Sequence, residues 1–371
     1  MSKRALGIIN IEPSYVHVEG IEDYRPISAT SFMGRYRIID FIISNLTNSG
    51  VNNIEVQVKN RPRSTIQHIQ RTDYNINTKR GHIRILHGEK PIPNEIYNTD
   101  VASLMANLKY FEEDNSPYVI LAPSHFIYVQ DFSKMLDYHI ESKNDITVLY
   151  QNVNSANEDF LMCDTLDIDE NKVITNIDKN LGKGKRAKVS LETYIMSKKI
   201  FIDMIYAALS TSSLYSLSDI IADGLDVFKI GGYLHTGYAA CISTLNSYYK
   251  ASMDIKNEKE LSNIFSDDWP IYTATNDTCP TTYTKTSNVS NCVVGNGCVI
   301  EGTVENCVIG RNVVVKEGAV IKDSIIMPDA LINKNVKMDK CVVDRLAIVT
   351  HIKALNGSDH APLYVKRGDR I

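Results

Sequence analysis

The stretch CVVGNGCVIEGTVENCVIGRNVVVKEGAVIKDSIIMPDALINKNVKMDKCVV, residues 292–343, decides the fold of the C-terminal part of this 371-residue chain. Aliphatic residues recur in it at steps of five or six positions, apart from one step of nine that Val304 divides. They are Val294, Ile300, Ile309, Val315, Ile321, Ile326, Ile332, Met338 and Val343. A small or β-branched residue stands two places before each of them. This hexapeptide pattern predicts a parallel β-helix, because each aliphatic side chain can stack on its equivalent in the next coil.

Cysteines account for four of the small positions in this repeat. They are Cys292, Cys298, Cys307 and Cys341. We interpret them as small buried hydrophobic residues, since free cysteine packs well in a core. The other three of the seven cysteines have neither CxxC nor Cys/His spacing, so we predict no metal site in this chain.

Ahead of the repeat, strand patterns alternate with helical patterns. The expected strands are 5–9, 53–58, 118–122 and 146–150. The expected helices are 37–45, 65–70 and 102–113. This alternation predicts a doubly wound α/β domain, with its site at the carboxyl ends of the strands.

The predicted organisation has three parts. Residues 1–253 form the α/β domain, residues 254–286 a polar linker, and residues 287–371 the β-helix. The linker contains Trp269, the only tryptophan, which we expect to contact a neighbouring surface.

The composition excludes several classes of protein. The chain is 43% hydrophobic and 23% charged, as in ordinary globular proteins. Its formal net charge is −4 and it has no long basic run, so we predict no nucleic-acid partner. No apolar stretch approaches the roughly 20 residues that span a bilayer. We therefore predict a cytoplasmic protein that does not bind membranes.

One family matches the motifs of the α/β part. Residues 34–41 read GRYRIIDF and are followed by Ser44-Asn45 and the NSG of 48–50. This segment resembles one in bacterial glucose-1-phosphate adenylyltransferases, and QHIQR at 67–71 and the helix pattern at 245–254 are similar to theirs. The resemblance implies a Rossmann-like, doubly wound nucleotidyltransferase domain followed by a left-handed parallel β-helix.

Enzymes of this family transfer an adenylyl group from ATP to glucose 1-phosphate, and three of their devices are missing here. Their glycine-rich phosphate loop corresponds to NIEPSY at 10–15, where the first following glycine is Gly20. The positions of their two metal-binding aspartates carry Ser124 and Cys241. Loss of a single preorganised electrostatic contact costs roughly 10²–10³ in rate. We therefore expect no catalytic residue and essentially no turnover.

The sugar-phosphate side of the family site is partly retained. The resemblance places Lys179 and Ser190 at its phosphate contacts. Glu192 stands where the family has a glycine, and Phe160–Met162 fills another glycine position. We interpret Lys179 and Ser190 as a vestigial sugar-phosphate site.

A retained frame with an erased site resembles the GlgD-type subunit that accompanies a catalytic GlgC-type subunit in low-GC Gram-positive bacteria. That resemblance implies a regulatory and structural subunit in glycogen (ADP-glucose) biosynthesis, stimulating its partner within a heterotetramer. It also implies no cofactor in this chain, with Mg²⁺ only in the catalytic partner.

Three arginines have two interpretations. Arg35, Arg37 and Arg71 can bind a phosphorylated effector, because guanidinium groups match phosphate geometry. They can equally be structural, with Arg37 paired to Asp40 or to another carboxylate.

Two enzyme classes are alternatives. An active sugar-1-phosphate nucleotidyltransferase would need substitute metal ligands such as Asp131 or Asp164. A hexapeptide acyltransferase would need a histidine in the β-helix, and residues 294–349 contain none.

Two further features favour structural roles. The basic run Lys179–Lys188 lacks the ending of a phosphate loop, so we interpret it as a mobile solvated loop. We expect His68 and His125 to be hydrogen-bonded packing residues, because neither has a nucleophile beside it in the sequence.

Overall fold

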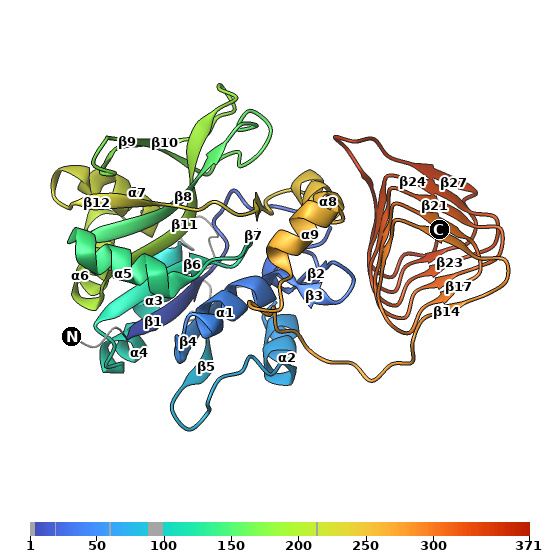
Figure 1. Ribbon diagram of the computed structural model, residues 1–371, viewed down its shortest axis with the longest axis horizontal. Helices are drawn as coiled ribbons and strands as arrows, with labels where there is room; N and C mark the ends of the chain where they lie inside the picture. Colours follow the sequence, from blue (N-terminus) through green and yellow to red (C-terminus); the bar gives the residue numbers. More distant parts are fainter. Residues whose placement is uncertain (1–3, 19, 59–60, 88–98, 213) are drawn as a thin grey trace.

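In the computed structural model, which describes residues 4–18, 20–58, 61–87, 99–212 and 214–371, an α/β domain lies beside a parallel β-helix (Figure 1). The predicted fold class is confirmed. Within the described residues, no helix is long and apolar enough to cross a membrane.

A mixed nine-stranded sheet forms the centre of the α/β domain. Its strands are β1 Ala5–Asn10, β4 Asn53–Val58, β5 His82–His87, β6 Tyr118–Pro123, β8 Ile146–Val153, β9 Asp164–Ile168, β10 Ile174–Lys179, β11 Ala187–Ser197 and β12 Ile230–Leu234. The main path runs β10-β9-β11-β6-β1-β4-β5, and β8 joins β11 to β12. Strands β6, β1, β4 and β5 are parallel, whereas β11 is antiparallel to β6 and β8. Two small ladders pair β2 Ser31–Phe32 with β3 Tyr36–Arg37, and β7 Phe126–Tyr128 with β13 Ala239–Cys241.

Helices cover both faces of the sheet. The helices of the described residues are α1 Ile38–Asn48, α2 Arg63–Arg71, α3 Asp100–Ala106, α4 Leu108–Glu113, α5 Phe132–Ser142, α6 Lys198–Thr211, α7 Leu217–Asp223, α8 Leu245–Asp254 and α9 Glu258–Ile264, with 3₁₀ turns at Ile27–Ala29 and Gly224–Asp226. Apolar side chains of α1 and α5 pack in one core, and those of α3, α4, α6 and α7 pack in a second core.

The helix expected over 102–113 is two helices. Asn107 interrupts it, and its amide donates to the carbonyl oxygens of Ser103 and His87, 3.0 and 3.2 Å away. A side chain that bonds nearby backbone competes with continuation of a helix.

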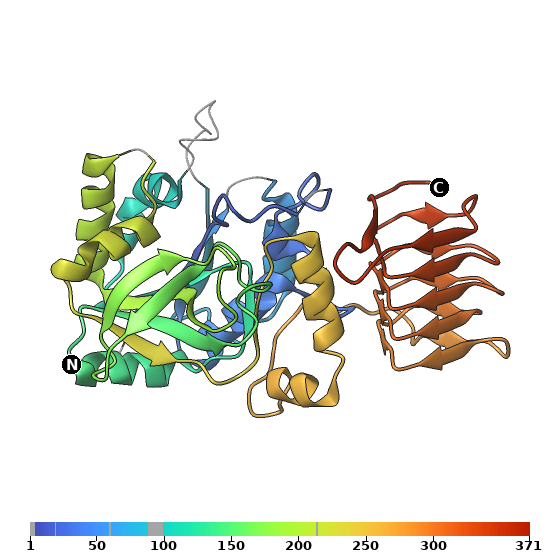
Figure 2. The same ribbon diagram turned by 90° about the horizontal axis from the view of Figure 1, so that it is seen from above.

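The β-helix consists of three parallel five-stranded sheets, and Figure 2 shows the strands of its successive coils stacked one above another. Their strands are β14 Thr282–Tyr283, β17 Val299–Ile300, β20 Val314–Val315, β23 Leu331–Ile332 and β26 Ile348–Val349; β15 Asn288–Ser290, β18 Thr303–Glu305, β21 Val320–Lys322, β24 Lys337–Asp339 and β27 Ala354–Asn356; and β16 Val293–Val294, β19 Val308–Ile309, β22 Ile325–Ile326, β25 Cys341–Val343 and β28 Leu363–Val365. The aliphatic positions from Ile300 onward are buried, as are Cys298, Cys307 and Cys341, so the predicted ladders are confirmed. Cys292 is half-buried.

The predicted linker 254–286 contains regular structure. It holds α9, and β14 already pairs in parallel with β17, so the β-helix begins at 282 rather than 287. The Trp269 indole donates to Oδ1 of Asn45 over 3.0 Å, which attaches this segment to α1 as expected.

The two domains share an apolar interface. Its buried side chains include Phe32 and Phe41 from the α/β domain, Tyr248 from α8, and Ile325 and Val342 from the β-helix. Gly34 lies in the tight turn between β2 and β3, with a φ of +73°. A Cβ at this position would lie 2.8 Å from the carbonyl oxygen of Ile309, so close approach of the domains requires glycine here.

Candidate functional site

Ser124 and Cys241, the positions at which the resemblance predicts metal aspartates, lie together at the carboxyl end of the sheet. Ser124 directly follows β6, and Cys241 ends β13. The β7–β13 ladder brings them close, since Cys241 is paired with Phe126. The Ser124 hydroxyl is buried without a hydrogen-bond partner, and the Cys241 thiol lies 3.7 Å from that of Cys163.

Tyr15 occupies the site from the segment that replaces the glycine-rich loop. Its hydroxyl donates to Oε1 of Glu192 over 2.5 Å and lies 3.1 Å from Nε2 of His125. Burial, together with the Glu192 carboxyl, raises the pKa of Tyr15 well above its ordinary value. The Tyr15 side chain, from the NIEPSY segment at 10–15, therefore takes up space beside Glu192 and His125.

Glu192 stands where the resemblance predicts a glycine, and its carboxyl contacts Tyr15 and His125. Its backbone is left-handed, with a φ of +49°, which explains why glycine suits this point of β11. Burial raises the pKa of Glu192 to about 7, although the hydrogen bond from Tyr15 opposes the shift. Burial also lowers the pKa of His125 to about 3, so this ring is neutral at physiological pH. The expectation of a hydrogen-bonded packing role for His125 is confirmed.

Lys179 and Ser190 are both engaged within the chain. The Lys179 ammonium lies 2.6 Å from the Asp164 carboxylate, which is almost fully buried. Although burial opposes the change, Asp164 raises the pKa of Lys179. The Ser190 hydroxyl accepts the backbone N–H of Glu192 over 3.1 Å. A sugar phosphate would therefore have to displace Asp164 from Lys179.

The proposed substitute ligands have other roles. Asp131 caps the N-terminus of α5 by accepting the Ser133 N–H, and it lies 3.4 Å from Lys134. Asp164 is held by Lys179. Across the described ranges, no group of three or more His, Cys, Asp or Glu side chains is placed to hold a metal ion.

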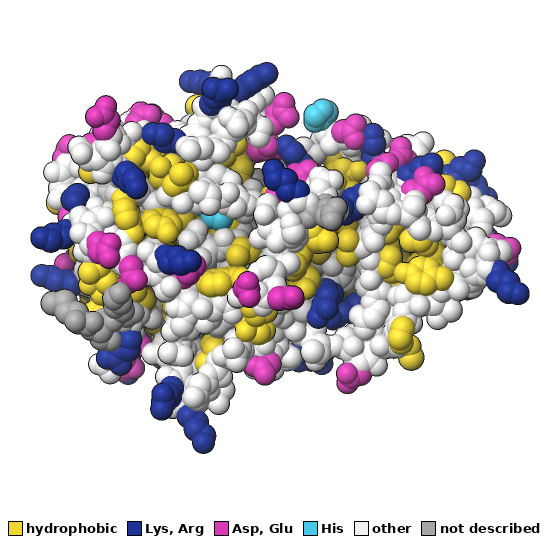
Figure 3. All heavy atoms as spheres, viewed as in Figure 1, with side chains coloured by type: hydrophobic (Ala, Val, Ile, Leu, Met, Phe, Trp, Pro, Cys, Tyr) yellow, Lys and Arg dark blue, Asp and Glu magenta, His cyan; other side chains and the backbone are white. Residues whose placement is uncertain are grey.

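The basic run Lys179–Lys188 is anchored at its base. The buried Asn180 amide donates to the carbonyl oxygens of Ala156, Asp159 and Phe160. Most of the basic side chains beyond it are exposed, as expected for a solvated loop. Figure 3 shows Lys and Arg side chains gathered over this loop at the top of the view.

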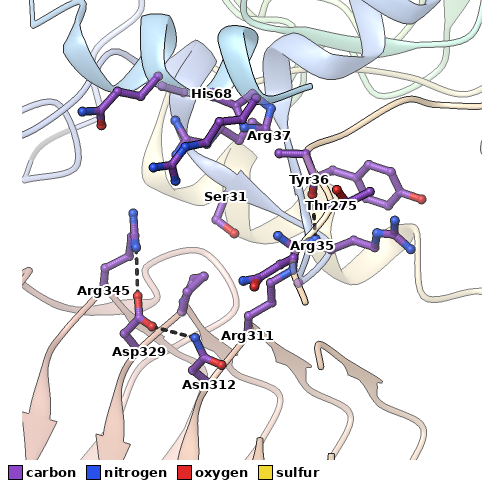
Figure 4. A pocket seen from close by; sticks show the side chains of 17 residues that line it. Ser31, Arg35, Tyr36, Arg37, His68, Thr275, Arg311, Asn312, Asp329 and Arg345 are labelled. Atoms are coloured by element: carbon purple, nitrogen blue, oxygen red, sulfur yellow. Dashed lines mark hydrogen bonds and ion pairs between the residues drawn. The ribbon is translucent and has the colours of Figure 1, made fainter. Parts of the chain in front are cut away.

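A second site, the arginine pocket, is a cavity of about 390 Å³ between the two domains. Five arginines line it: Arg35, Arg37, Arg71, Arg311 and Arg345. The structure thus brings the three predicted arginines together with two from the β-helix. Figure 4 shows the helix-borne side chains and the β-helix turns facing each other across the cavity.

The sequence analysis missed Arg311 and Arg345. They follow β19 and β25, the two strands that flank β22 in one sheet. They therefore lie at the same turn of the β-helix, separated by one coil. The register of the repeat could have predicted that Arg311 and Arg345 lie close together, because equivalent positions of successive coils stack in space.

The arginine pocket has an excess of positive charge. Burial, followed by the neighbouring Arg345, lowers the pKa of Arg37 to about 10, although Asp40 opposes the shift. Burial and Arg35 likewise lower the pKa of Arg311. Among the described residues that line the cavity, Asp329 is the only acidic one. Such a site favours an anion that can accept several guanidinium hydrogen bonds.

The structural alternative predicted an ion pair between Arg37 and Asp40 or another carboxylate, and the structure shows a different partner. Its guanidinium donates to the carbonyl oxygen of Ser64 over 2.7 Å instead of pairing with Asp40. The Asp40 carboxylate accepts the Arg37 backbone N–H at 2.8 Å, and lies 2.6 Å from both His68 Nε2 and the Tyr74 hydroxyl. The packing role expected of His68 is confirmed.

Comparison with known proteins agrees with both domains. The model of the "Nucleotidyl transferase" family matches residues 25–258. The model described as "GlmU-like, C-terminal hexapeptide" matches residues 278–361.

Individual relatives match most of the chain. A "Glycogen biosynthesis protein GlgD" of Bacillus subtilis is 28% identical over 373 residues, covering 99% of this chain and 97% of that protein. The protein of the same name from Geobacillus stearothermophilus is 29% identical, covering 86% and 83%. A "Glucose-1-phosphate adenylyltransferase" of Lachnospira eligens is 30% identical, covering 78% of this chain and 69% of that protein.

Proposed function

This chain belongs to the nucleotidyl transferase family and is of the GlgD type, and from that membership we propose a catalytically silent regulatory and structural subunit. It would act beside a GlgC-type glucose-1-phosphate adenylyltransferase in glycogen biosynthesis. The hydrogen bond between Tyr15 and Glu192, inside the family's catalytic site, carries this proposal.

Several side chains in this region oppose the binding of a nucleotide. The approach of a triphosphate needs open backbone N–H groups and a cation. Here the space contains the Tyr15 phenol and the Glu192 carboxyl, and Lys179 is already neutralised by Asp164. Ser124 and Cys241 supply neither of the carboxylates that would hold Mg²⁺. These obstacles involve different side chains, so replacement of one residue leaves the others in place.

We expect the purified chain to release no pyrophosphate above background from ATP, Mg²⁺ and glucose 1-phosphate. Mixed with the catalytic subunit of the same organism, it should raise pyrophosphate release above the rate of that subunit alone. Enzyme-coupled detection of pyrophosphate measures both rates, and light scattering of the mixture reports whether a heterotetramer forms.

The control is the catalytic subunit mixed with an equal amount of an unrelated protein. Robust turnover by the chain alone would contradict the silent-subunit proposal. Unchanged partner activity, with no co-elution of the two proteins, would contradict the regulatory role.

The arginine pocket is our candidate for the regulatory site. We propose that Arg35, Arg37 and Arg71 bind a phosphorylated effector together with Arg311 and Arg345. The support is that five arginines line one cavity, whose described lining residues include a single carboxylate.

Replacing Arg71 by Gln should weaken binding of inorganic pyrophosphate by about three- to tenfold, as expected for one charge-assisted contact in a partly exposed site. Arg71 is exposed at the end of α2, so the substitution leaves the core intact. Titration calorimetry without divalent metal measures the affinity.

R63Q is the matched control, because Arg63 is exposed on the first turn of the same helix and does not line the cavity. Equal affinities of R71Q and R63Q would contradict the assignment of the arginine pocket.

A further inference from the structure

Asp329 lines the arginine pocket and forms an ion pair with one of its arginines, Arg345. Its Oδ2 lies 2.8 Å from a terminal nitrogen of Arg345, and its Oδ1 accepts the Asn312 amide over 3.1 Å (Figure 4). Both members of the ion pair are about one-third exposed, at 30% and 36%, so this carboxylate is reachable from the cavity. Arg345 Nε is buried without a partner, which leaves donor capacity on the same guanidinium.

The turn explains how this carboxylate is held in place. Asp329 is left-handed, with a φ of +66°, and Asn312 has the same conformation one coil earlier, with a φ of +58°. Asparagine and aspartate tolerate this region better than most residues. The two side chains form one step of a ladder along the β-helix, so the backbone position of Asp329 does not depend on its charge.

We propose that Asp329 is an internal competitor for the anion of the arginine pocket, and that a bound anion takes its place on Arg345. This inference rests on the arginine pocket of the proposed function and adds the residue that sets its affinity. An incoming phosphate group meets an arginine that already has a counter-ion, and it must also approach a like charge. Both effects weaken binding, and both vanish when the carboxylate is neutral.

Asp329→Asn is the sharpest variant, because asparagine suits the left-handed turn and keeps an oxygen to accept from Asn312. The D329N chain should bind inorganic pyrophosphate about two- to fivefold more tightly than the wild type, the range of a partly exposed ion pair. In an R345Q background the same change should give a smaller gain, since the counter-ion effect acts through Arg345.

Asp323 offers a matched control. It is left-handed, with a φ of +42°, and accepts the Asn306 amide over 3.1 Å in another ladder of turns. It does not line the cavity. D323N therefore makes the same chemical change at an equivalent turn, and it should leave the affinity unchanged.

Calorimetric titration of the full chain at constant ionic strength, without divalent metal, separates the two proposals. Tighter binding by D329N than by D323N supports the proposal that Asp329 competes with the anion. Measurable binding by D329N alone supports it as well. Binding that is weakened by R71Q but equal in D329N and D323N overturns the competitor and leaves the arginine pocket standing. If neither the wild type nor D329N binds pyrophosphate, both proposals are overturned.

Discussion

Replacing Asp344 by Ala is expected to lower the free energy of unfolding by about 3–5 kcal/mol, the cost of leaving one member of a buried ion pair uncompensated. Asp344 belongs to the β-helix and lies 2.7 Å from Arg25 of the α/β domain, with both side chains at most 5% exposed. It also accepts the Tyr364 hydroxyl over 2.7 Å.

The Arg25 guanidinium has little else to bind. Its Nε and one terminal nitrogen are buried without a partner among the described residues, and its other hydrogen-bond contact there is the Met327 sulfur at 3.1 Å. Loss of Asp344 therefore leaves the Arg25 guanidinium buried in the interface between the domains without its counter-ion. Replacing both residues with apolar ones of similar size, as in R25M/D344L, should recover most of the loss, because the desolvation penalty then disappears with the charges.

Denaturant unfolding monitored by the single tryptophan measures this effect, since Trp269 lies in the segment between the domains. The control is D359A, which removes the Lys340–Asp359 pair, where the aspartate is 72% exposed. An exposed pair contributes roughly 0–1 kcal/mol. A loss in D344A no larger than that in D359A would show that the buried pair does not hold the domains together.

The second large effect is a pH dependence that Glu192 imposes on stability. The ordinary pKa of its carboxyl is 4.5, and burial raises the pKa in the folded chain to about 7. Between these values the folded state binds more protons than the unfolded state, so stability falls as the pH rises. The contribution is fully present below about pH 4.5 and is lost above about pH 7, and its full size is about 3 kcal/mol.

Glu192→Gln should remove this dependence, because glutamine stays neutral and its amide oxygen can still accept from the Tyr15 hydroxyl. E192Q should therefore be more stable than the wild type at pH 8 and close to it at pH 5. Denaturant unfolding of both proteins at the two pH values gives the difference that belongs to this residue.

The exposed Glu158 provides the control, and E158Q should track the wild type at both pH values. If the gap between E192Q and the wild type is the same at pH 5 and pH 8, Glu192 does not titrate in this range.

Local pattern was sufficient for most of the architecture. The strand expected over 53–58 forms over those same residues, because an alternating pattern suits a strand with two unlike faces. The hexapeptide spacing predicted the β-helix, since stacked coils require buried side chains at a constant step. Its first coil was missed, because Thr282–Tyr283 pairs with β17 without an aliphatic signal of its own.

The chemical differences from the resembling family could also be read from the sequence. The absence of glycine between Asn10 and Tyr15 and the residues Ser124 and Cys241 are chemical facts that no packing can reverse. The sequence did not show which side chains would lie in this region of the fold. Tyr15 meets Glu192 only because β1 and β11 both flank β6, which brings residues from distant parts of the chain to one point.

The sequence by itself therefore determined the two-domain architecture, and it shows NIEPSY, Ser124 and Cys241 at the positions where the family resemblance predicts the phosphate loop and the metal carboxylates. Only the tertiary structure decided which side chains occupy the region of the predicted phosphate loop, and where charged side chains lie close together. The arginine pocket joins Arg35, Arg37 and Arg71 to Arg311 and Arg345 across the domain interface, and Asp329 neutralises part of it. The physical reason is that periodicity reports the faces of one element, whereas electrostatic clustering depends on distances between elements that only packing brings together.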